Sequence, residues 1–192
     1  MALAGNANAQ LGIHAGYSPE SWSNENNTTN LNTFFAGVDY NTPVTGDLKV
    51  NIGAQLRYGT ESSSSSVLGI AAGQHTSTLI GIDVPVLLNL GINLTSDLKT
   101  TVFAGPKLSY GLSAKTKYEG SVLGIGGSTE QNWYDANGMN LKQFNISATF
   151  GLVFEYNQFR LFGGYNYGLL DMDNANTKTT INGLFFGLGF AM

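Results

Sequence analysis

The stretch LKVNIGAQLRYG, residues 48–59, alternates strictly between apolar residues and polar or small ones. Side chains of an extended strand point to opposite faces with period two, so Leu48 and Tyr58 share one face and Lys49 and Arg57 share the other. In a water-soluble protein the apolar face is buried, whereas in a membrane barrel it contacts lipid and the charged face lines the interior. The stretch fits both classes of protein, so the rest of the chain has to discriminate between them.

The composition favours a protein that contacts lipid. Charged residues make up 11% of the 192 residues, compared with about 25% in ordinary soluble domains. A membrane barrel needs charges only in its loops and its interior, which explains so low a content. No apolar run reaches the length of roughly 18 residues that a spanning helix requires, so only strands could cross a bilayer.

Charge and cysteine content narrow the function classes further. The net charge is −4 and the 9 basic residues are scattered, which excludes nucleic acid as a partner because phosphate binding needs clustered lysines and arginines. The chain contains no cysteine, so disulfides, thiolate zinc sites and cysteine nucleophiles are excluded. No linker-like segment divides the sequence, which indicates one domain.

Residues 1–9 are small and uncharged, and they end in Ala7-Asn8-Ala9 before Gln10. Such A-x-A sequences precede the cleavage sites of secretory signal peptides. We therefore expect residues 1–9 to be a residual signal-peptide tail and residues 10–192 to form the single domain. The alternative interpretation of residues 1–9 is a disordered tail of small residues.

Strand-like alternation recurs in eight segments, and no segment shows a sustained helical period. The longest is residues 80–92, in which every second residue is apolar. Its length exceeds the roughly 5 or 6 residues of an ordinary globular strand and suits the roughly ten residues of a tilted membrane strand. The pattern predicts an all-β fold, an eight-stranded antiparallel up-and-down transmembrane β-barrel.

The connections between these segments alternate in length. Short connections fall at residues 41–47, 95–97 and 157–158, and long ones fall at roughly residues 19–30, 60–77, 113–142 and 168–180. Outer-membrane barrels have short periplasmic turns and long extracellular loops, so both termini are expected on the periplasmic side. The ESSSSS run at 61–66 and LGIGGST at 123–129 are interpreted as solvated, flexible loops within the long connections.

Glycines and tyrosines separate the inner face from the outer one. The face that carries Lys49 and Arg57 also carries most glycines of the strand segments, and the interior of an eight-stranded barrel has space only for limited side-chain volume. Tyrosines lie on the apolar face near strand ends, as in the aromatic girdles of membrane barrels: Tyr17, Tyr40, Tyr58, Tyr110, Tyr156 and Tyr167. We therefore expect Lys49 and Arg57 inside and Leu56 and Tyr58 facing lipid.

Three segments resemble a known family. The runs IGIDVPVLLNLGI (80–92), TTVFAGPKLSYGL (100–112) and FGLVFEYNQFRLFGGYNYGLLDM (150–172) are similar to the PorT-like outer-membrane β-barrel proteins of Bacteroidetes. Those proteins share a D/E-x-P-x-L strand, an A-G-P strand and a closing G-Y-x-Y-G-L region. The resemblance implies an outer-membrane barrel and no shared activity. The last strand also resembles an outer-membrane assembly signal, although it ends in Met192 and not in an aromatic residue.

Eight charged residues are predicted to form a polar network in the lumen, with a structural role: Asp39, Lys49, Arg57, Asp83, Lys99, Lys107, Glu155 and Arg160. Opposite charges on one inner face can pair, and side chains fill an eight-stranded interior. If Asn157 and Gln158 form a two-residue hairpin, Glu155 stands opposite Arg160. We expect no catalytic residue and no cofactor. We also expect no metal site, because Asp171 and Asp173 with Asn174 are only a weak calcium motif.

The sequence thus predicts a non-enzymatic outer-membrane protein with a plugged lumen, which acts through its long loops or through protein contacts in adhesion, structure or export. The expected partners are outer-membrane lipid, the barrel assembly machinery during insertion and a protein bound by the loops, with the barrel itself a monomer. One alternative is a lipid-modifying enzyme built on His75 and Ser77, which lie close in sequence. Another is a soluble lipocalin-like carrier with an apolar interior.

Overall fold

The computed structural model describes residues 10–24, 28–67, 70–122, 125–136, 139–174 and 178–192. The expectation of a signal-peptide tail at 1–9 lies outside these residues. The described residues form nine strands: β1 (Gln10–Ser23), β2 (Thr28–Thr45), β3 (Leu48–Val67), β4 (Ile70–Asn93), β5 (Leu98–Val122), β6 (Ile125–Asn132), β7 (Phe144–Tyr156), β8 (Phe159–Gly168) and β9 (Thr180–Ala191). None of the described segments is a helix long and apolar enough to span a membrane.

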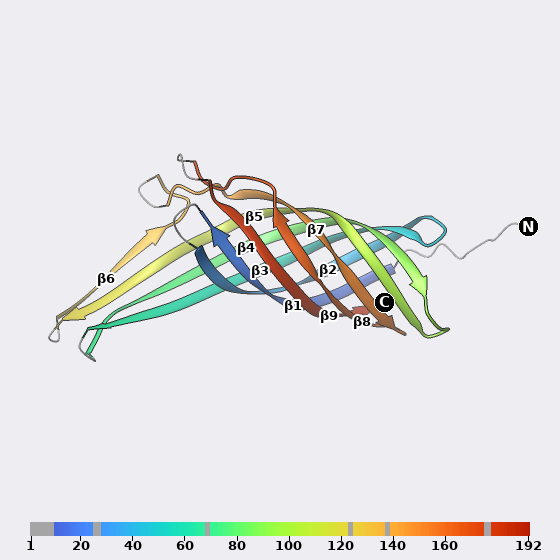
Figure 1. The fold of residues 1–192 in the computed structure, drawn as a ribbon, viewed down its shortest axis with the longest axis horizontal. Coiled ribbons are helices and arrows are strands. Elements are labelled where there is room, and N and C mark those ends of the chain that lie inside the picture. The colour runs from blue at the N-terminus through green and yellow to red at the C-terminus, as the bar shows by residue number, and fades with distance from the viewer. Residues whose placement is uncertain (1–9, 25–27, 68–69, 123–124, 137–138, 175–177) are drawn as a thin grey trace, which may run out of the picture.

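Eight of the strands close into an antiparallel barrel (Figure 1). Each strand pairs with its sequence neighbour, except that β5 pairs with β7, and β1 closes the barrel against β9. The predicted eight-stranded up-and-down barrel is therefore confirmed. The ninth strand, β6, pairs only with β5 and stands outside the barrel.

The outer wall of the barrel is apolar. Leu56 and Leu188 expose 63% and 67% of their surface, and five of the six tyrosines predicted for the girdle are about half-exposed on the same side, at 48% for Tyr58 and 55% for Tyr167. Tyr17 is less exposed. Lys107 and Arg57 instead lie buried inside, with 7% and 5% exposed. The face assignment made from the sequence is confirmed, and a lipocalin-like barrel with an apolar interior and a polar outside is contradicted.

Inside the barrel, phenylalanine rings lie over glycines of the neighbouring strand. Four such pairs stand directly opposite each other in the strand register: Gly16 and Phe35, Gly151 and Phe103, Gly164 and Phe185, and Gly187 and Phe162. A Cβ atom at any of these glycines would overlap the facing ring. The narrow interior is thus filled by pairing its largest side chains with its smallest residues.

The short turns lie at one end of the barrel, together with the start of β1 and the end of β9 (Figure 1). They connect Thr45 to Leu48, Asn93 to Leu98 and Tyr156 to Phe159. Gly46 and Asn157 both have a φ of +53°, a left-handed conformation that glycine and asparagine adopt at low cost in tight hairpins. The predicted two-residue hairpin at 157–158 is confirmed, with Glu155 opposite Arg160.

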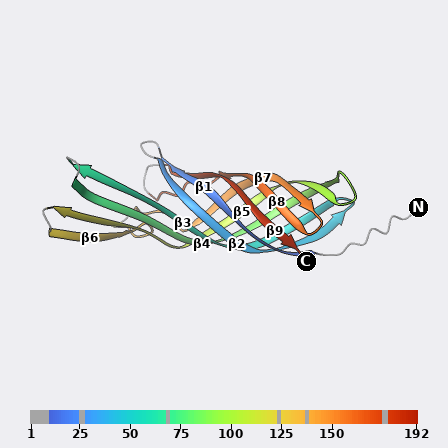
Figure 2. The same ribbon diagram turned by 90° about the horizontal axis from the view of Figure 1, so that it is seen from below.

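The opposite end corrects the sequence prediction. The segments expected as long loops at 60–77 and 113–142 are largely strands, because β3, β4 and β5 continue past the barrel and β6 joins them. Beyond the barrel these strands pair as a four-stranded sheet, called the extension here, which consists of residues 61–67, 70–77, 115–122 and 125–132. Figure 2 shows the extension projecting from one end of the barrel. The ESSSSS run belongs to β3 and residues 125–129 to β6, so both interpretations as flexible loop were wrong there.

Candidate functional site in the closed lumen

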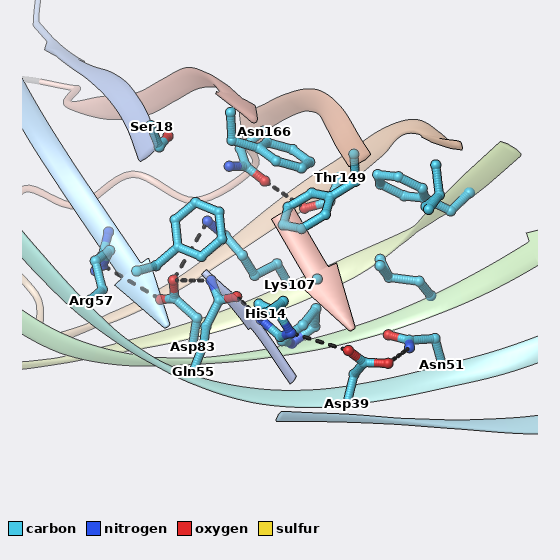
Figure 3. A pocket seen from close by; sticks show the side chains of 18 of the residues that line it. His14, Ser18, Asp39, Asn51, Gln55, Arg57, Asp83, Lys107, Thr149 and Asn166 are labelled. Atoms are coloured by element: carbon cyan, nitrogen blue, oxygen red, sulfur yellow. Dashed lines mark hydrogen bonds and ion pairs between the residues drawn. The ribbon is translucent and has the colours of Figure 1, made fainter. Parts of the chain in front are cut away.

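A chain of hydrogen bonds and ion pairs runs along the inside of the barrel (Figure 3). It joins side chains from seven strands, each pointing inward because of the alternation of its own strand. The members, from the extension end to the short-turn end, are Glu20, Arg57, Asp83, Lys107, Gln55, His14, Asp39, Arg160 and Glu155.

The upper section of this chain centres on Arg57. Its Nη1 donates to both carboxylate oxygens of Glu20, at 3.2 and 3.1 Å, and its Nε lies 3.5 Å from Oδ1 of Asp83. Lys107 Nζ lies 3.7 Å from the other oxygen of Asp83. These four side chains are almost fully buried, so each charge has an opposite charge beside it in a place where an unpaired one would be costly.

The middle section passes through His14. Gln55 donates through Nε2 to Asp83 at 3.1 Å, and its Oε1 lies 3.1 Å from Nε2 of His14. The other ring nitrogen, Nδ1, lies 3.1 Å from Oδ2 of Asp39. Both partners of the ring are oxygen acceptors, so both hydrogen bonds form together when the imidazole carries two protons.

The lower section converges on Asp39. Its Oδ1 accepts hydrogen bonds from Arg160 at 2.9 Å, Asn41 at 3.0 Å and Asn51 at 3.1 Å. Arg160 in turn places its Nε 3.4 Å from Oε2 of Glu155, across the short hairpin. A carboxylate with three donors is held in one position, which fixes the three strands that supply these donors.

A cavity of about 120 Å³ lies beside this chain. Its lining includes the polar side chains of Lys107 and Gln55 and the inward rings of Phe35, Phe103 and Phe162. The cavity is therefore an internal space between the ion pairs and the phenylalanine rings.

Above the cavity, at the extension end, the lumen is closed by a buried apolar cluster, called the cap here. It consists of Trp22, Leu31, Leu79, Ala114, Trp133, Leu141, Met172 and Ile181. Trp133 donates through Nε1 to Oγ1 of Thr116 at 2.8 Å, and its ring contacts Trp22 edge-on. Tyr134 packs against the cap and lies over Gly111, and burial raises the pKa of its hydroxyl.

Segments from two long connections contribute Trp133, Leu141 and Met172 to the cap, and these segments are hydrogen-bonded to each other. The amide of Leu141 donates to Trp133 at 2.8 Å, and the amide of Lys142 donates to Met172 at 2.7 Å. Asp171 closes the second segment, because its Oδ1 accepts the amides of Thr179 and Asp173 at 2.9 and 3.0 Å. These bonds hold the pKa of Asp171 below its usual value. That carboxylate oxygen, considered as a weak calcium ligand from the sequence, is thus engaged by the backbone.

The structure places all eight predicted network residues on the inner face, and it joins six of them through the contacts above. Lys49 and Lys99 line a second, smaller cavity at the short-turn mouth. The predicted network did not include three members of this chain: Glu20, Gln55 and His14. Glu20 was assigned to a loop, although it continues the inward alternation of Gly12, His14, Gly16 and Ser18 along β1.

The residues considered for acyl-chain chemistry lie on the extension. His75 Nε2 is 3.6 Å from Oε2 of Glu61, a carboxylate that is distant in the sequence. The Ser77 hydroxyl is buried and lies 2.9 Å from Oγ1 of Thr116. A serine nucleophile needs a hydrogen bond to its base, and the hydroxyl of Ser77 is directed to Thr116 instead.

Known proteins share this architecture. The crystal structure of Ail, the attachment invasion locus protein of Yersinia pestis, is similar with a TM-score of 0.52 and 13% identity over 96% of this chain and 99% of that one. The Ail complex with the heparin analogue sucrose octasulfate gives 0.51 and 14% over the same shares. Neisserial surface protein A gives a TM-score of 0.49 and 13% identity over 95% and 98%. The two likenesses to Ail show the fold alone.

No curated protein sequence matches the chain. Residues 4–174 match the family model described as outer membrane protein beta-barrel domain. This match covers most of the chain and agrees with the closed barrel, its apolar outer wall and its polar interior. The chain belongs to the outer membrane protein beta-barrel domain family and is an outer-membrane protein.

Proposed function

We propose that the protein is a non-enzymatic, non-conducting outer-membrane barrel that presents its extension at the cell surface as a contact surface for another protein. The observation that carries this proposal is the combination of a filled lumen with a folded, projecting sheet. The cap and the ion-pair chain occupy the path through the barrel. The extension is built from strands that continue from the barrel wall and pair with one another, so it is a folded sheet and not a set of loose loops.

The orientation follows from the same proposal. The extension lies outside the cell, and the short turns and both ends of the barrel domain lie in the periplasm, as in other outer-membrane barrels. The three runs at 80–92, 100–112 and 150–172 support a more specific placement among PorT-like proteins of this class. We further propose that the barrel is a monomer in the membrane and that the barrel assembly machinery inserts it.

Adhesion is the role that the extension supports best. Its outer face is strongly polar, with Lys115 bonded to Glu130 at 2.6 Å and Lys117 to Glu119 at 2.6 Å. Its other face continues the inner wall and carries the rings of Tyr118 and His75, about two-fifths exposed and 6.1 Å apart. An exposed aromatic pair flanked by hydrogen-bonding groups is typical of a protein contact surface.

Site-specific photo-crosslinking in living cells tests this function. A photoreactive residue at Thr129 of the extension is expected to give discrete crosslinked protein products, whereas the same residue at Ser96 in a short turn or at the lipid-facing Leu56 gives none of these products. Protease added to intact cells is expected to cleave the extension and spare the short turns. Equal crosslinking from Ser96 and Thr129, or no product from Thr129, would contradict the proposal.

The enzyme alternative has its own assay. Release of acyl chains from outer-membrane lipid by the purified protein, lost on the substitution His75→Ala, would replace the present proposal with a lipid-modifying activity. We expect no release above that of a protein-free control.

A further inference from the structure

The charges inside the barrel balance in the upper section and not in the lower one. In the upper section Arg57 and Lys107 face Glu20 and Asp83, so two cations meet two carboxylates. In the lower section three basic side chains face the two carboxylates Asp39 and Glu155; they are Lys49, Lys99 and Arg160. Among the inward-facing groups the lower section therefore carries one surplus positive charge, and the exposed Asp47 of the turn between β2 and β3 also lines the cavity.

The surplus resides on the two lysines. Arg160 is paired with Asp39 and Glu155, but neither Lys49 nor Lys99 makes a hydrogen bond or ion pair within the described part of the chain. Lys49 is the second residue of β3 and Lys99 the second residue of β5, and both side chains point inward. The end of the Lys99 side chain lies over Gly91 on β4, the strand between β3 and β5, so it leans toward Lys49.

These groups share one cavity of about 40 Å³ at the short-turn mouth. Lys49, Lys99 and Arg160 line it together with neutral donors such as Asn41 and Thr101. Arg160 is nine-tenths buried, and its Nη2 has no hydrogen-bond partner among the described residues. A buried guanidinium nitrogen without an acceptor is unfavourable, and an oxyanion is the acceptor that guanidinium groups bind best.

Among the described residues, the acidic side chains at this cavity make no close ion pair with the lysines. Glu155 lies opposite Lys99 in the strand register but directs its carboxylate to Arg160. Asp47 lies exposed in the turn before β3, where solvent and salt screen its charge, and it forms no ion pair with the lysines among the described residues. Like charges held close together stabilise a bound ion of opposite sign.

We propose that the short-turn mouth of the lumen is a binding site for a phosphate group, held by Lys49, Lys99 and the free Nη2 of Arg160. Lys49, Lys99 and Arg160 line one cavity from β3, β5 and β8, and together they can donate to several oxygens of a phosphate whose negative charge offsets the surplus of the inward-facing groups. The phosphate group belongs either to free inorganic phosphate or to the headgroup of an anionic lipid.

Titration of the full chain in zwitterionic detergent micelles with inorganic phosphate tests the site. Ionic strength is held constant with chloride, and backbone amide NMR shifts are followed at Gly91, Lys99 and Thr101. We expect saturable shifts confined to the mouth. Lys49→Gln and Lys99→Gln are each expected to weaken phosphate affinity at least about tenfold, which corresponds to about 1.4 kcal/mol, whereas Lys49→Arg retains it.

Lys117→Gln on the extension is the matched control, because it removes the same charge far from the mouth. It is expected to leave phosphate affinity unchanged. NMR shifts that increase with phosphate concentration without saturating would overturn the proposal and indicate general screening. An equal loss of phosphate affinity in Lys117→Gln and Lys99→Gln would overturn it in the same way. The spectrum of each variant should keep the amide chemical-shift dispersion of the folded barrel. This shows that loss of phosphate binding is not caused by unfolding.

Nanodiscs distinguish the two sources of the phosphate group. If the lipid headgroup is the ligand, discs that contain phosphatidylglycerol reproduce the shifts at Gly91 and Thr101 without added phosphate, and discs of phosphatidylcholine alone do not. If free phosphate is the ligand, both kinds of disc require its addition and give the same affinity. Absence of mouth-specific shifts in either disc, with and without phosphate, would contradict the site.

Discussion

Trp22 on β1 and Trp133 beyond β6 contact each other edge-on, with ring centroids 5.3 Å apart and planes 70° from parallel. They are the two tryptophans of the chain, and both are buried, with 6% and 2% exposed. Their contact joins the first strand of the barrel to the long connection before β7. The cap is therefore held by residues more than a hundred positions apart, and it closes the lumen as part of the folded barrel.

Loss of the Trp133 ring should destabilise the cap. Trp133→Ala removes a buried ring and its hydrogen bond to Thr116, so we expect a loss of about 3–5 kcal/mol in the free energy of unfolding in lipid vesicles. Trp133→Phe keeps most of the apolar volume and should cost less. Tyr118→Ala, which truncates a half-exposed ring on the extension, is the control; if it costs as much as Trp133→Ala, the cap is not a packed core.

The pairing of inner glycines with phenylalanine rings predicts a sharp size limit. Gly187→Ala places a methyl group against Phe162 and the adjacent strand, so we expect destabilisation of about 1–3 kcal/mol. Gly127→Ala is the matched control, because no atom lies within 4 Å of the added methyl group on β6. Urea unfolding in vesicles compares the two, and equal stabilities would mean that the inner rings can move aside freely.

Substitution of Leu56 tests which face of the barrel contacts lipid. It is 63% exposed on the outer wall near the middle of β3, so Leu56→Arg should lower stability in lipid by about 2–4 kcal/mol, the cost of arginine near the bilayer midplane. Leu56→Ala controls for the lost side chain and should cost much less. The neighbouring Gln55 is a poor control, since the structure places it in hydrogen bonds with His14 and Asp83. An arginine variant as stable as the alanine variant would reverse the faces.

Glu155 and Arg160 should be energetically coupled. They lie opposite each other across the short hairpin with Nε and Oε2 3.4 Å apart. The double variant Glu155→Ala, Arg160→Ala is expected to cost less than the sum of the single variants, with a coupling of about 0.5–3 kcal/mol. The exposed pair Lys115 and Glu130 gives the comparison and should show weaker coupling. Additive costs at 155 and 160 would mean that the ion pair contributes nothing.

The sequence predicts the barrel well because lipid imposes a simple pattern. Every spanning strand must place apolar residues outward, so alternation in β3, β4 and β7 identifies the strands, their faces and the inner charges. The hairpin at Asn157 and Gln158 even fixes the partner of Glu155. Each of these features depends on residues close together in the chain.

The extension and the cap depend on contacts between segments that lie far apart in the chain. Strand residues 61–66 are serines and a glutamate with no apolar face, since water surrounds both sides of the extension, so alternation cannot reveal them. On β5 a bulge between Gly111 and Ser113 reverses the faces, which turns Ala114 inward. Trp133 and Met172 are buried only because two distant connections fold over the mouth. One local feature of the sequence does point to the buried residues at this end. The inward alternation of β1 continues past Ser18 and places Glu20 and Trp22 inside.

Electrical recording in planar lipid bilayers tests the central claim most directly, namely that side chains close the lumen. The cap, the phenylalanine rings and the ion-pair chain from Glu20 to Glu155 occupy the interior of an eight-stranded barrel, which is too narrow to hold a free aqueous channel beside them. We predict no stable single-channel conductance from the unmodified protein, at either sign of the voltage. Steady, ion-selective conductance from the same preparation would contradict the closed lumen and the function built on it.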